Sequence, residues 1–321
     1  MTIDTVRLSV VSKLKKFDWV ESELITVDKT NNREFRKYIT KGLEGEKVVP
    51  RLTYQVGDEE LNRLMVEVSL PKLLLQENFT VLSDSQIIES MDKLQDWVSN
   101  KIGQSFGSWA AWHVSRLDAC YAWKVGDDMK DYIGSLVNLP VHGYTRSPYI
   151  RGDQITEGFT WHCKSRKVNV YDKGLECGDL AAQGLLRLEC QERTNDAVKT
   201  LVSREKGDNL AGELINGDVA RKDINRWLKR SGLGSDMKTS VNVVDLLKEE
   251  FGYEAASRIY FIEGFKRFGS AMVSKDWCSK ETYYKRHREL SKKGYLLNAK
   301  EKSLPGLKIS KTKNLKKGDN P

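Results

Sequence analysis

The feature of the sequence that most constrains the fold is a set of three segments in which apolar and polar residues alternate. The first is KVNVYDKGLE, where two valines alternate with Asn169, Tyr171 and Lys173. Side chains on a β-strand point to opposite faces with a period of two, so the valines are expected to face a core while the tyrosine and the lysine share the other face. Gly174 then favours a turn. Taken alone, this segment is best explained as a solvated strand face.

The segments VSRLDACYAW, from residue 114, and GLLRLECQER, from residue 184, alternate in the same way. Arg116 and Asp118 share the polar face of one, and Arg187 and Glu189 share the polar face of the other. A carboxylate inside an otherwise apolar strand is unfavourable unless it is paired or ligated. If the three strands are neighbours in one sheet, two carboxylates flank Tyr171, with cations nearby.

Strand-like segments dominate the first part of the chain, and amphipathic helical segments dominate from about residue 196. Strands are predicted at 2–11, 47–55 and 64–70, helices at 85–101 and 127–139, and a hairpin within 140–163. We therefore predict an α+β fold with a mostly antiparallel sheet. The predicted domains are a sheet domain at 1–195, a helix-turn-helix-like DNA-binding domain at 196–299 and a basic disordered tail at 300–321.

The basic residues are concentrated near the C-terminal end of the sequence. The chain has 53 Lys and Arg against 45 Asp and Glu, a net charge of +8. Residues 280–321 alone carry 13 basic and 4 acidic residues, so the rest of the chain is close to neutral. This asymmetry indicates a nucleic acid or an anionic membrane as partner. The predicted DNA contacts of the last helix are Lys285, Arg286, Arg288 and Lys292.

Several classes of protein are not expected. No apolar run approaches the roughly 20 residues that span a bilayer, and the first residues lack the apolar stretch of a signal peptide. The five cysteines show no CxxC spacing, which indicates reduced thiols in a cytoplasm and no zinc site. No GxxxxGK[ST] loop occurs, so no nucleotide cofactor is expected. The four histidines form no His-x-His pair, although His113 and His162 lie near the predicted strands and are candidates to assist.

The three polar stripes suggest chemistry on a phosphate. A tyrosine hydroxyl can attack a DNA phosphodiester and form a covalent phosphotyrosine, if a divalent metal or cations neutralise the developing charge. Mg²⁺ or Mn²⁺ prefers carboxylate oxygens, which Asp118 and Glu189 can supply, with Glu176 as a further ligand or base. Lys173 is placed to contact the phosphate or to lower the tyrosine pKa. The candidate phosphate contacts near the strands are Arg116, Arg187 and Arg193.

Five segments in this order resemble the rolling-circle replication initiators of filamentous phages and related plasmids, the gene II/X replication protein family. They are VSRLDACYA, KVNVYDKGLE, LLRLECQER, SRIYFIEGFKRFG and ETYYKRHRELSKKGY, and EVSLPKLLLQENF also resembles the N-terminal signature of that family. The family's nucleophile matches Tyr171, its strand acid matches Asp118, and its Arg-x-Glu matches Arg187 and Glu189. The chain departs from a two-tyrosine arrangement, because no second tyrosine is paired helically with Tyr171.

The resemblance implies that the protein nicks one strand of a double-stranded origin and stays attached to the 5′ phosphate. The free 3′ hydroxyl then primes a host polymerase while a host helicase unwinds the duplex, and the displaced single strand is later cut and closed. Two alternatives remain open from the residues alone. One is a non-catalytic origin- or operator-binding protein, and the other is a metal-dependent phosphodiesterase in which water attacks and Tyr171 is structural.

Overall fold

The computed structural model describes most of the chain. The described residues are 1–15, 20, 22–28, 33–40, 50–56, 62–136, 139, 141–151, 155–201, 209–234, 249, 256–268, 273, 277–293 and 307–309. They divide into two compact units. Unit 1 comprises Met1–Ile133 and Gly143–Ile224, and unit 2 comprises Gly134–His142 and Asn225–Pro321.

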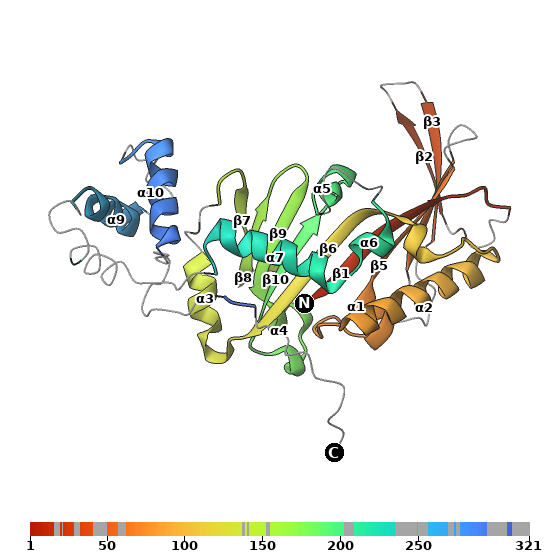
Figure 1. Ribbon diagram of the computed structural model, residues 1–321, viewed down its shortest axis with the longest axis horizontal. Coiled ribbons are helices and arrows are strands. Elements are labelled where there is room, and N and C mark those ends of the chain that lie inside the picture. The colour runs from red at the N-terminus through yellow and green to blue at the C-terminus, as the bar shows by residue number, and fades with distance from the viewer. Residues whose placement is uncertain are drawn as a thin grey trace, which may run out of the picture. The chain divides into compact units, whose positions relative to one another are not determined.

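Unit 1 is built on a ten-stranded antiparallel sheet (Figure 1), which confirms the predicted α+β class. The strand order is β2-β3-β4-β5-β1-β6-β10-β9-β8-β7. The strands are β1 (Thr2–Val11), β2 (Ser22–Asp28), β3 (Arg33–Ile39), β4 (Arg51–Val56), β5 (Arg63–Ser69), β6 (His113–Lys124), β7 (Thr145–Arg151), β8 (Ile155–His162), β9 (Arg166–Asp172) and β10 (Leu185–Glu192). The three alternating segments of the sequence are β6, β9 and β10, and they are neighbours in the sheet as the site hypothesis requires.

The described part of the chain also contains helices. They are α1 (Leu70–Leu75), α2 (Asp84–Ile102), α3 (Met129–Leu136), α4 (Lys173–Cys177), α5 (Asn195–Lys199), α6 (Ala211–Leu214), α7 (Gly217–Ser231), α9 (Ala256–Phe268) and α10 (Lys280–Lys292). Short 3₁₀ turns lie at Trp109–Ala111, Gly126–Asp128 and Leu180–Ala182. Among the described helices, none has both the length and the apolar composition that crossing a membrane requires.

The apolar face of the sheet forms the core of unit 1. Its central side chains are completely buried; they include Leu117, Ala119, Val168, Val170, Leu186, Leu188 and Cys190. Helices α1 and α2 contact β1 beside this core. The period-two alternation therefore assigns these side chains to the core correctly. The five cysteines are free.

Helix α2 begins at Asp84, one residue before the predicted start at 85. Ser83 is its N-cap, because its side chain accepts from the Gln86 amide while the Gln86 side chain accepts from the Ser83 amide. This reciprocal capping box satisfies two amides that the first turn leaves unpaired. Gly103 ends the helix with a φ of 70°, a left-handed conformation that glycine adopts without a steric penalty.

The division between the units falls later in the chain than the predicted boundary at residue 195. Helices α5 and α6 and the first half of α7 belong to unit 1. A buried ion-pair network explains this, because Asp223 of α7 pairs with Arg166 of β9 at 2.5 Å, and Arg166 also pairs with Glu192 of β10 at 2.9 Å. Sequence periodicity finds the helix but does not reveal which core it joins.

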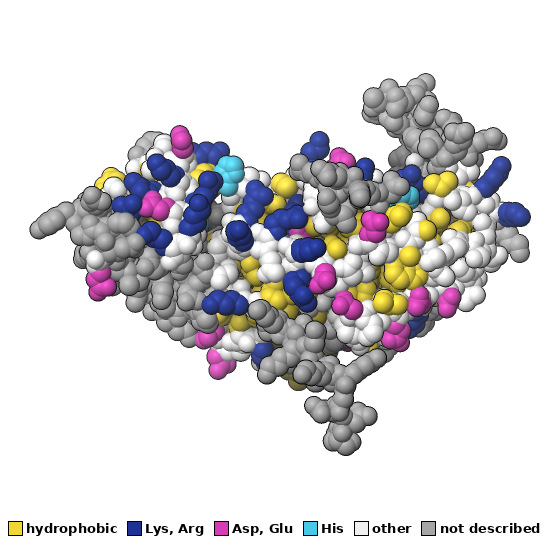
Figure 2. All heavy atoms as spheres, viewed as in Figure 1, with side chains coloured by type: hydrophobic (Ala, Val, Ile, Leu, Met, Phe, Trp, Pro, Cys, Tyr) yellow, Lys and Arg dark blue, Asp and Glu magenta, His cyan; other side chains and the backbone are white. Residues whose placement is uncertain are grey.

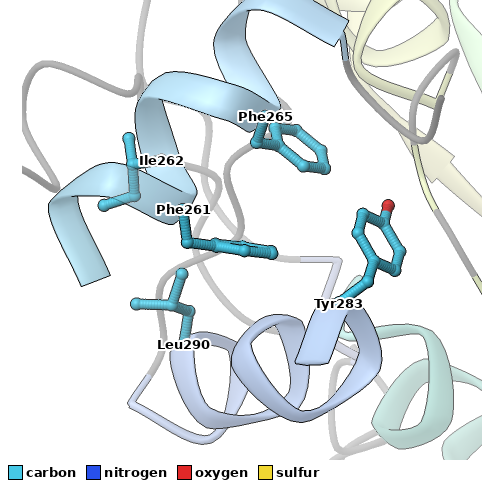
Figure 3. Close-up of a cluster of buried hydrophobic side chains, with 5 residues drawn as sticks. All are labelled: Phe261, Ile262, Phe265, Tyr283 and Leu290. Carbon is cyan, nitrogen blue, oxygen red and sulfur yellow. The ribbon is translucent and has the colours of Figure 1, made fainter. Parts of the chain in front are cut away.

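In unit 2, α9 and α10 pack around one apolar cluster. Phe261, Ile262 and Phe265 of α9 face Tyr283 and Leu290 of α10 (Figure 3). Ser279 is the N-cap of α10, and its side chain accepts from the Thr282 amide at 3.1 Å. The segment VNVVDLLKEEFG (241–252), which the sequence predicts as the first of three short helices before residue 295, lies outside the described residues except for Glu249.

The predicted tail at 300–321 also lies mostly outside the described residues. Where it is described, at 307–309, the expectation of disorder is wrong. Leu307 is buried, and its amide donates to the carbonyl of Leu233 at 2.7 Å. An apolar side chain within a lysine-rich stretch was the available signal.

Candidate tyrosine site on the polar face of the sheet

The register of β9, β10 and β6 brings the predicted polar residues onto one face. Tyr171 is directly opposite Arg187, and Glu189 is directly opposite Cys120. Residues directly opposite each other in an antiparallel pair share a face, so Asp118, Tyr171, Arg187 and Glu189 lie on the same side of the sheet. We call this surface the tyrosine face.

The Tyr171 hydroxyl donates to Oε2 of Glu189 at 3.3 Å, and the residue is only 3% exposed. Burial raises the pKa of this hydroxyl well above its usual range, the Glu189 carboxylate raises it further, and Arg187 opposes both effects. The hydroxyl therefore keeps its proton at neutral pH. A reaction at its oxygen requires a base, and Glu189 is the base within reach.

Tyr171 is stacked on a second tyrosine that the sequence did not single out. Tyr149 of β7 and Tyr171 of β9 have ring centroids 5.0 Å apart and an interplanar angle of 20°. Gly158 of β8 lies between them, opposite both residues in register. A Cβ at Gly158 would meet the Val170 carbonyl oxygen and would lie 2.5 Å from the Tyr171 Cα, so only glycine fits. The two rings thus cover the gap that the glycine leaves.

Lys173 does not continue the strand as predicted. It begins α4, because Asp172 caps the helix by accepting from the Leu175 amide at 3.2 Å, and Gly174 lies inside the helix rather than in a turn. The Lys173 ammonium pairs with Glu176 at 2.5 Å and lies 5.9 Å from the Tyr171 ring centroid. Its side chain is only 1% exposed. The buried Lys173 ammonium therefore packs near the Tyr171 ring. In this arrangement a phosphate on the protein surface cannot contact Lys173.

Asp118 is held by Arg116. The guanidinium binds both carboxylate oxygens, at 2.9 and 2.6 Å, and its third nitrogen binds Glu67 of β5 at 2.7 Å. Glu67 also binds Arg7 of β1 at 2.5 Å. Burial raises the pKa of Asp118 well above its usual range although the hydrogen bond from Arg116 lowers it, and Glu189 raises it further. The tyrosine face thus extends as alternating charges across β10, β6, β1 and β5.

The three predicted metal ligands already have protein partners. Asp118 binds Arg116 through both oxygens, Glu176 binds Lys173, and Glu189 accepts from Tyr171 and, at 2.5 Å, from Gln191. In the described part of the chain, no group of three or more His, Cys, Asp or Glu side chains is placed to hold a metal ion. As arranged, these acids do not fit Mg²⁺ or Mn²⁺, because their oxygens are already bound by protein side chains.

Arg187 lies on the tyrosine face and is buried there, only 2% exposed. It pairs with Asp4 at 2.8 Å, contacts the Cys120 sulfur at 3.1 Å and donates to the Asn78 carbonyl. Burial raises the pKa of the Cys120 thiol to about 12, so the sulfur is a packing partner and not a nucleophile. Arg187 thus stabilises charge near Tyr171 from inside the protein. The predicted phosphate contact Arg193, in contrast, is exposed just beyond β10.

Asp4, Glu67, Gln191 and Tyr149 were not predicted from the sequence as site residues. Gln191 had a usable signal, because it continues the Arg187–Glu189 stripe of β10. Asp4 lies at a register shift between β1 and β6, where strand period no longer predicts direction. Of the candidate histidines, His162 lies four residue pairs along the strand from Tyr171, about 13 Å away. His113 lies at the start of β6 and pairs with Leu210.

The predicted basic helix lies in unit 2. Lys285, Arg288 and Lys292 are exposed on α10. Arg286 binds Glu289 at 2.8 Å and Ser257 of α9 at 3.1 Å, so it joins the two helices. Lys and Arg side chains gather over α10 in Figure 2.

No family model matches the chain. No curated protein matches it either. A solved structure described as the rolling circle replication initiator protein from Geobacillus stearothermophilus is similar to it, with 15% sequence identity and a TM-score of 0.36. The similarity covers 71% of this chain and 84% of that one. A structural similarity with so low a TM-score and identity shows neither the fold nor the activity of this chain.

Proposed function

We propose that this chain cuts one strand of DNA by attack of the Tyr171 hydroxyl on a phosphodiester, and later rejoins a strand by the reverse step. The observation that carries the proposal is the hydrogen bond from the Tyr171 hydroxyl to Glu189. The same face of the sheet also holds Asp118, bound by Arg116, and the buried Arg187. A phenol whose pKa is raised needs a base in contact with it, and this site supplies one.

The Tyr171 oxygen forms a bond to phosphorus, its proton passes to Glu189, and the bond from phosphorus to the 3′ oxygen breaks. The 3′ oxygen takes up a proton from solvent water and leaves as a free hydroxyl, Glu189 returns its proton to solvent, and the 5′ phosphate stays on the tyrosine. Arg116 and Arg187 contribute positive charge where negative charge develops on the phosphate. Rejoining reverses these changes, because the phosphotyrosine keeps the energy of the broken bond.

Tyr171 must become accessible before it can react. One side of its ring is covered by Tyr149, which is only half-buried and belongs to the hairpin of β7 and β8. We propose that a DNA strand takes the place of the Tyr149 ring when it enters. The free 3′ hydroxyl suits a host polymerase, and a host helicase would supply the unwinding. The proposed substrates are a double-stranded origin and the strand displaced from it.

A cleavage assay tests this function. Supercoiled plasmid carrying the origin is incubated with the protein and Mg²⁺, and both nicked circles and a protein–DNA adduct are measured. Tyr171→Phe removes the nucleophile but keeps the stacked ring, so we expect both products to fall by about 10³-fold or more. If the phenylalanine variant still nicks without an adduct, water is the nucleophile and the assignment of Tyr171 is wrong.

A requirement for Mg²⁺ or Mn²⁺ stays a prediction from the sequence. Binding of either ion by Asp118 would require Arg116 to release that carboxylate. The same assay with EDTA in place of Mg²⁺ tests it. Loss of cleavage on adding EDTA, restored by Mn²⁺, supports a metal. Unchanged cleavage assigns the charge neutralisation to the arginines.

The low exposure of Tyr171 favours a second candidate, a DNA-binding protein without cleavage activity. In that case wild-type protein binds the origin fragment but yields neither nicked circles nor an adduct at any time point. The two candidates therefore give opposite results in one experiment.

A further inference from the structure

Unit 2 contains a groove of about 810 Å³ whose described lining residues include basic side chains and no Asp or Glu. The basic residues are Lys229, Arg230, Arg288, Lys292 and Lys308. Lys229 and Arg230 belong to α7, Arg288 and Lys292 belong to α10, and Lys308 follows the buried Leu307. Cations from three separate segments thus converge on one hollow, which is unfavourable unless an anion occupies it.

The groove is held in shape by contacts within unit 2. Arg230 donates to the His142 carbonyl at 2.7 Å, and the His142 ring meets the Tyr284 ring edge to face with centroids 4.9 Å apart. The Leu307 amide donates to the Leu233 carbonyl at 2.7 Å, which fixes the position of the backbone beside Lys308. Both sides of the groove are therefore built by side chains that the fold positions.

One lining residue has an unused polar atom. His287 is 9% exposed, and its Nε2 has no hydrogen-bond partner among the described residues. Buried polar atoms are nearly always paired, so an unpaired one on the wall of a groove indicates a missing ligand. Tyr284, His287, Arg288 and Lys292 are spaced so that they follow one side of α10.

We propose that this groove binds a single strand of nucleic acid, with its phosphates between α7 and α10. A duplex presents a convex surface and is read by a protruding helix. Here the basic side chains of α10 line a hollow instead. Single-strand sites combine a basic groove with aromatic rings on which bases stack, and Tyr284 and His142 provide such rings. The inference deepens the proposed function by naming the form of DNA that unit 2 holds, and it depends on that function only for the source of the strand.

Fluorescence anisotropy with a labelled oligothymidylate tests the proposal, and the same label on a duplex is measured beside it. All proteins carry Tyr171→Phe, so that cleavage does not interfere. We expect Arg288→Ala with Lys292→Ala to weaken single-strand binding at least about tenfold and to reduce its dependence on salt. The matched control, Lys130→Ala with Lys222→Ala, removes two exposed charges elsewhere, and binding is expected to stay within about twofold.

A second variant keeps every charge. Tyr284→Leu removes a stacking ring and is expected to weaken oligothymidylate binding about fivefold or more, with little change in the salt dependence. Equal losses from the groove pair and the control pair would show a nonspecific charge effect and overturn the proposal. Tighter binding to the duplex, lost in the same groove variants, would overturn it in favour of a recognition helix. Circular dichroism on each variant confirms that it is folded.

The outcome is separable from that of the proposed function. Oligothymidylate binding needs no reaction at Tyr171, so a failure of plasmid nicking leaves this inference intact. Conversely, if the groove variants bind like wild type, the groove assignment fails while cleavage of the plasmid can still proceed through Tyr171.

Discussion

Two ion-pair networks lie on opposite faces of the same sheet. On the apolar face, Arg166 binds Glu192 and Asp223, and the three side chains are between 0 and 8% exposed. On the tyrosine face, Arg116 binds Asp118 and Glu67, and Arg116 and Glu67 remain 22 and 23% exposed. Each network has one arginine between two acids, and on the tyrosine face Glu67 binds Arg7 as well. Helix α7 supplies Asp223 to the network of Arg166 and covers it. The network of Arg116 remains partly exposed to solvent on the face that holds Tyr171.

The arginines of the two networks behave alike. Burial alone would lower the pKa of Arg166, but Asp223 and Glu192 raise it above its usual range. Burial likewise opposes a high pKa of Arg116, but Asp118 and Glu67 raise it. What marks the tyrosine face is Asp118, because burial raises the pKa of this carboxyl even though Arg116 opposes the effect. We infer that the first is structural and that the second is kept for its chemistry.

The largest expected effect is a loss of stability when the network around Arg166 is broken. Asp223→Asn leaves Arg166 with one acid fewer in a fully buried site, and breaking a buried pair typically costs about 3–5 kcal/mol. The free energy of unfolding, measured by urea denaturation, is expected to fall by that amount. The control Asp218→Asn lies on the same helix in an exposed pair with Arg221 and is expected to cost less than about 0.5 kcal/mol. Equal effects at the two positions would contradict the assignment.

An aspartate-to-asparagine substitution on the tyrosine face is expected to lower activity and to change stability little. Asp118→Asn removes a carboxylate whose burial is unfavourable, so we expect the free energy of unfolding to stay within about 1 kcal/mol. Plasmid nicking is expected to fall about 10²-fold, because the variant changes the charge around Arg116 and Glu189. If Asp118→Asn instead lost much of its free energy of unfolding while each folded molecule nicked at the wild-type rate, the network on the tyrosine face would be structural.

The pH dependence sharpens this second prediction. The pKa of Asp118 is higher in the folded protein than in the unfolded chain, so between the two values the folded state binds more protons. The wild type is therefore expected to gain stability relative to Asp118→Asn as the pH falls through this window towards about 4. Urea denaturation at a series of pH values, with EDTA present, measures the difference between the two proteins. A difference that shrinks with falling pH would place the pKa of Asp118 below its unfolded value.

The two networks also show what the sequence can predict. Strand period correctly places Arg116, Asp118 and Glu189 on one face, because direction along a strand is a local property. It does not place Glu67 or Asp223, which reach their arginines through strand order and helix packing between segments far apart in the chain. Lys173 was misplaced because a capping aspartate ended the strand one residue earlier than alternation implied.

A third prediction concerns the glycine beneath the two tyrosines. Gly158→Ala places a Cβ against the Val170 carbonyl and 2.5 Å from the Tyr171 Cα, so the strands must separate locally. Overpacking of this kind costs about 1–3 kcal/mol, and we expect Tyr171 to move away from Glu189 and nicking to fall with it. Thermal unfolding and plasmid nicking measure both effects. Thr145→Ala, at an exposed position of the same hairpin, is expected to change neither, and wild-type nicking in Gly158→Ala would contradict the close fit.

The smallest effect is expected at the open end of the tyrosine face. Arg7 is 39% exposed and binds Glu67, which also binds Arg116. Exposed pairs contribute little, so Arg7→Gln is expected to change the free energy of unfolding by less than about 1 kcal/mol. Glu67 keeps Arg116 as a partner, and nicking is expected to fall only a few-fold. Urea denaturation and plasmid nicking of Arg7→Gln measure the two quantities against Asp118→Asn. If Arg7→Gln loses as much nicking as Asp118→Asn does, the site extends to β1, and the first strands of the chain hold the DNA next to Tyr171.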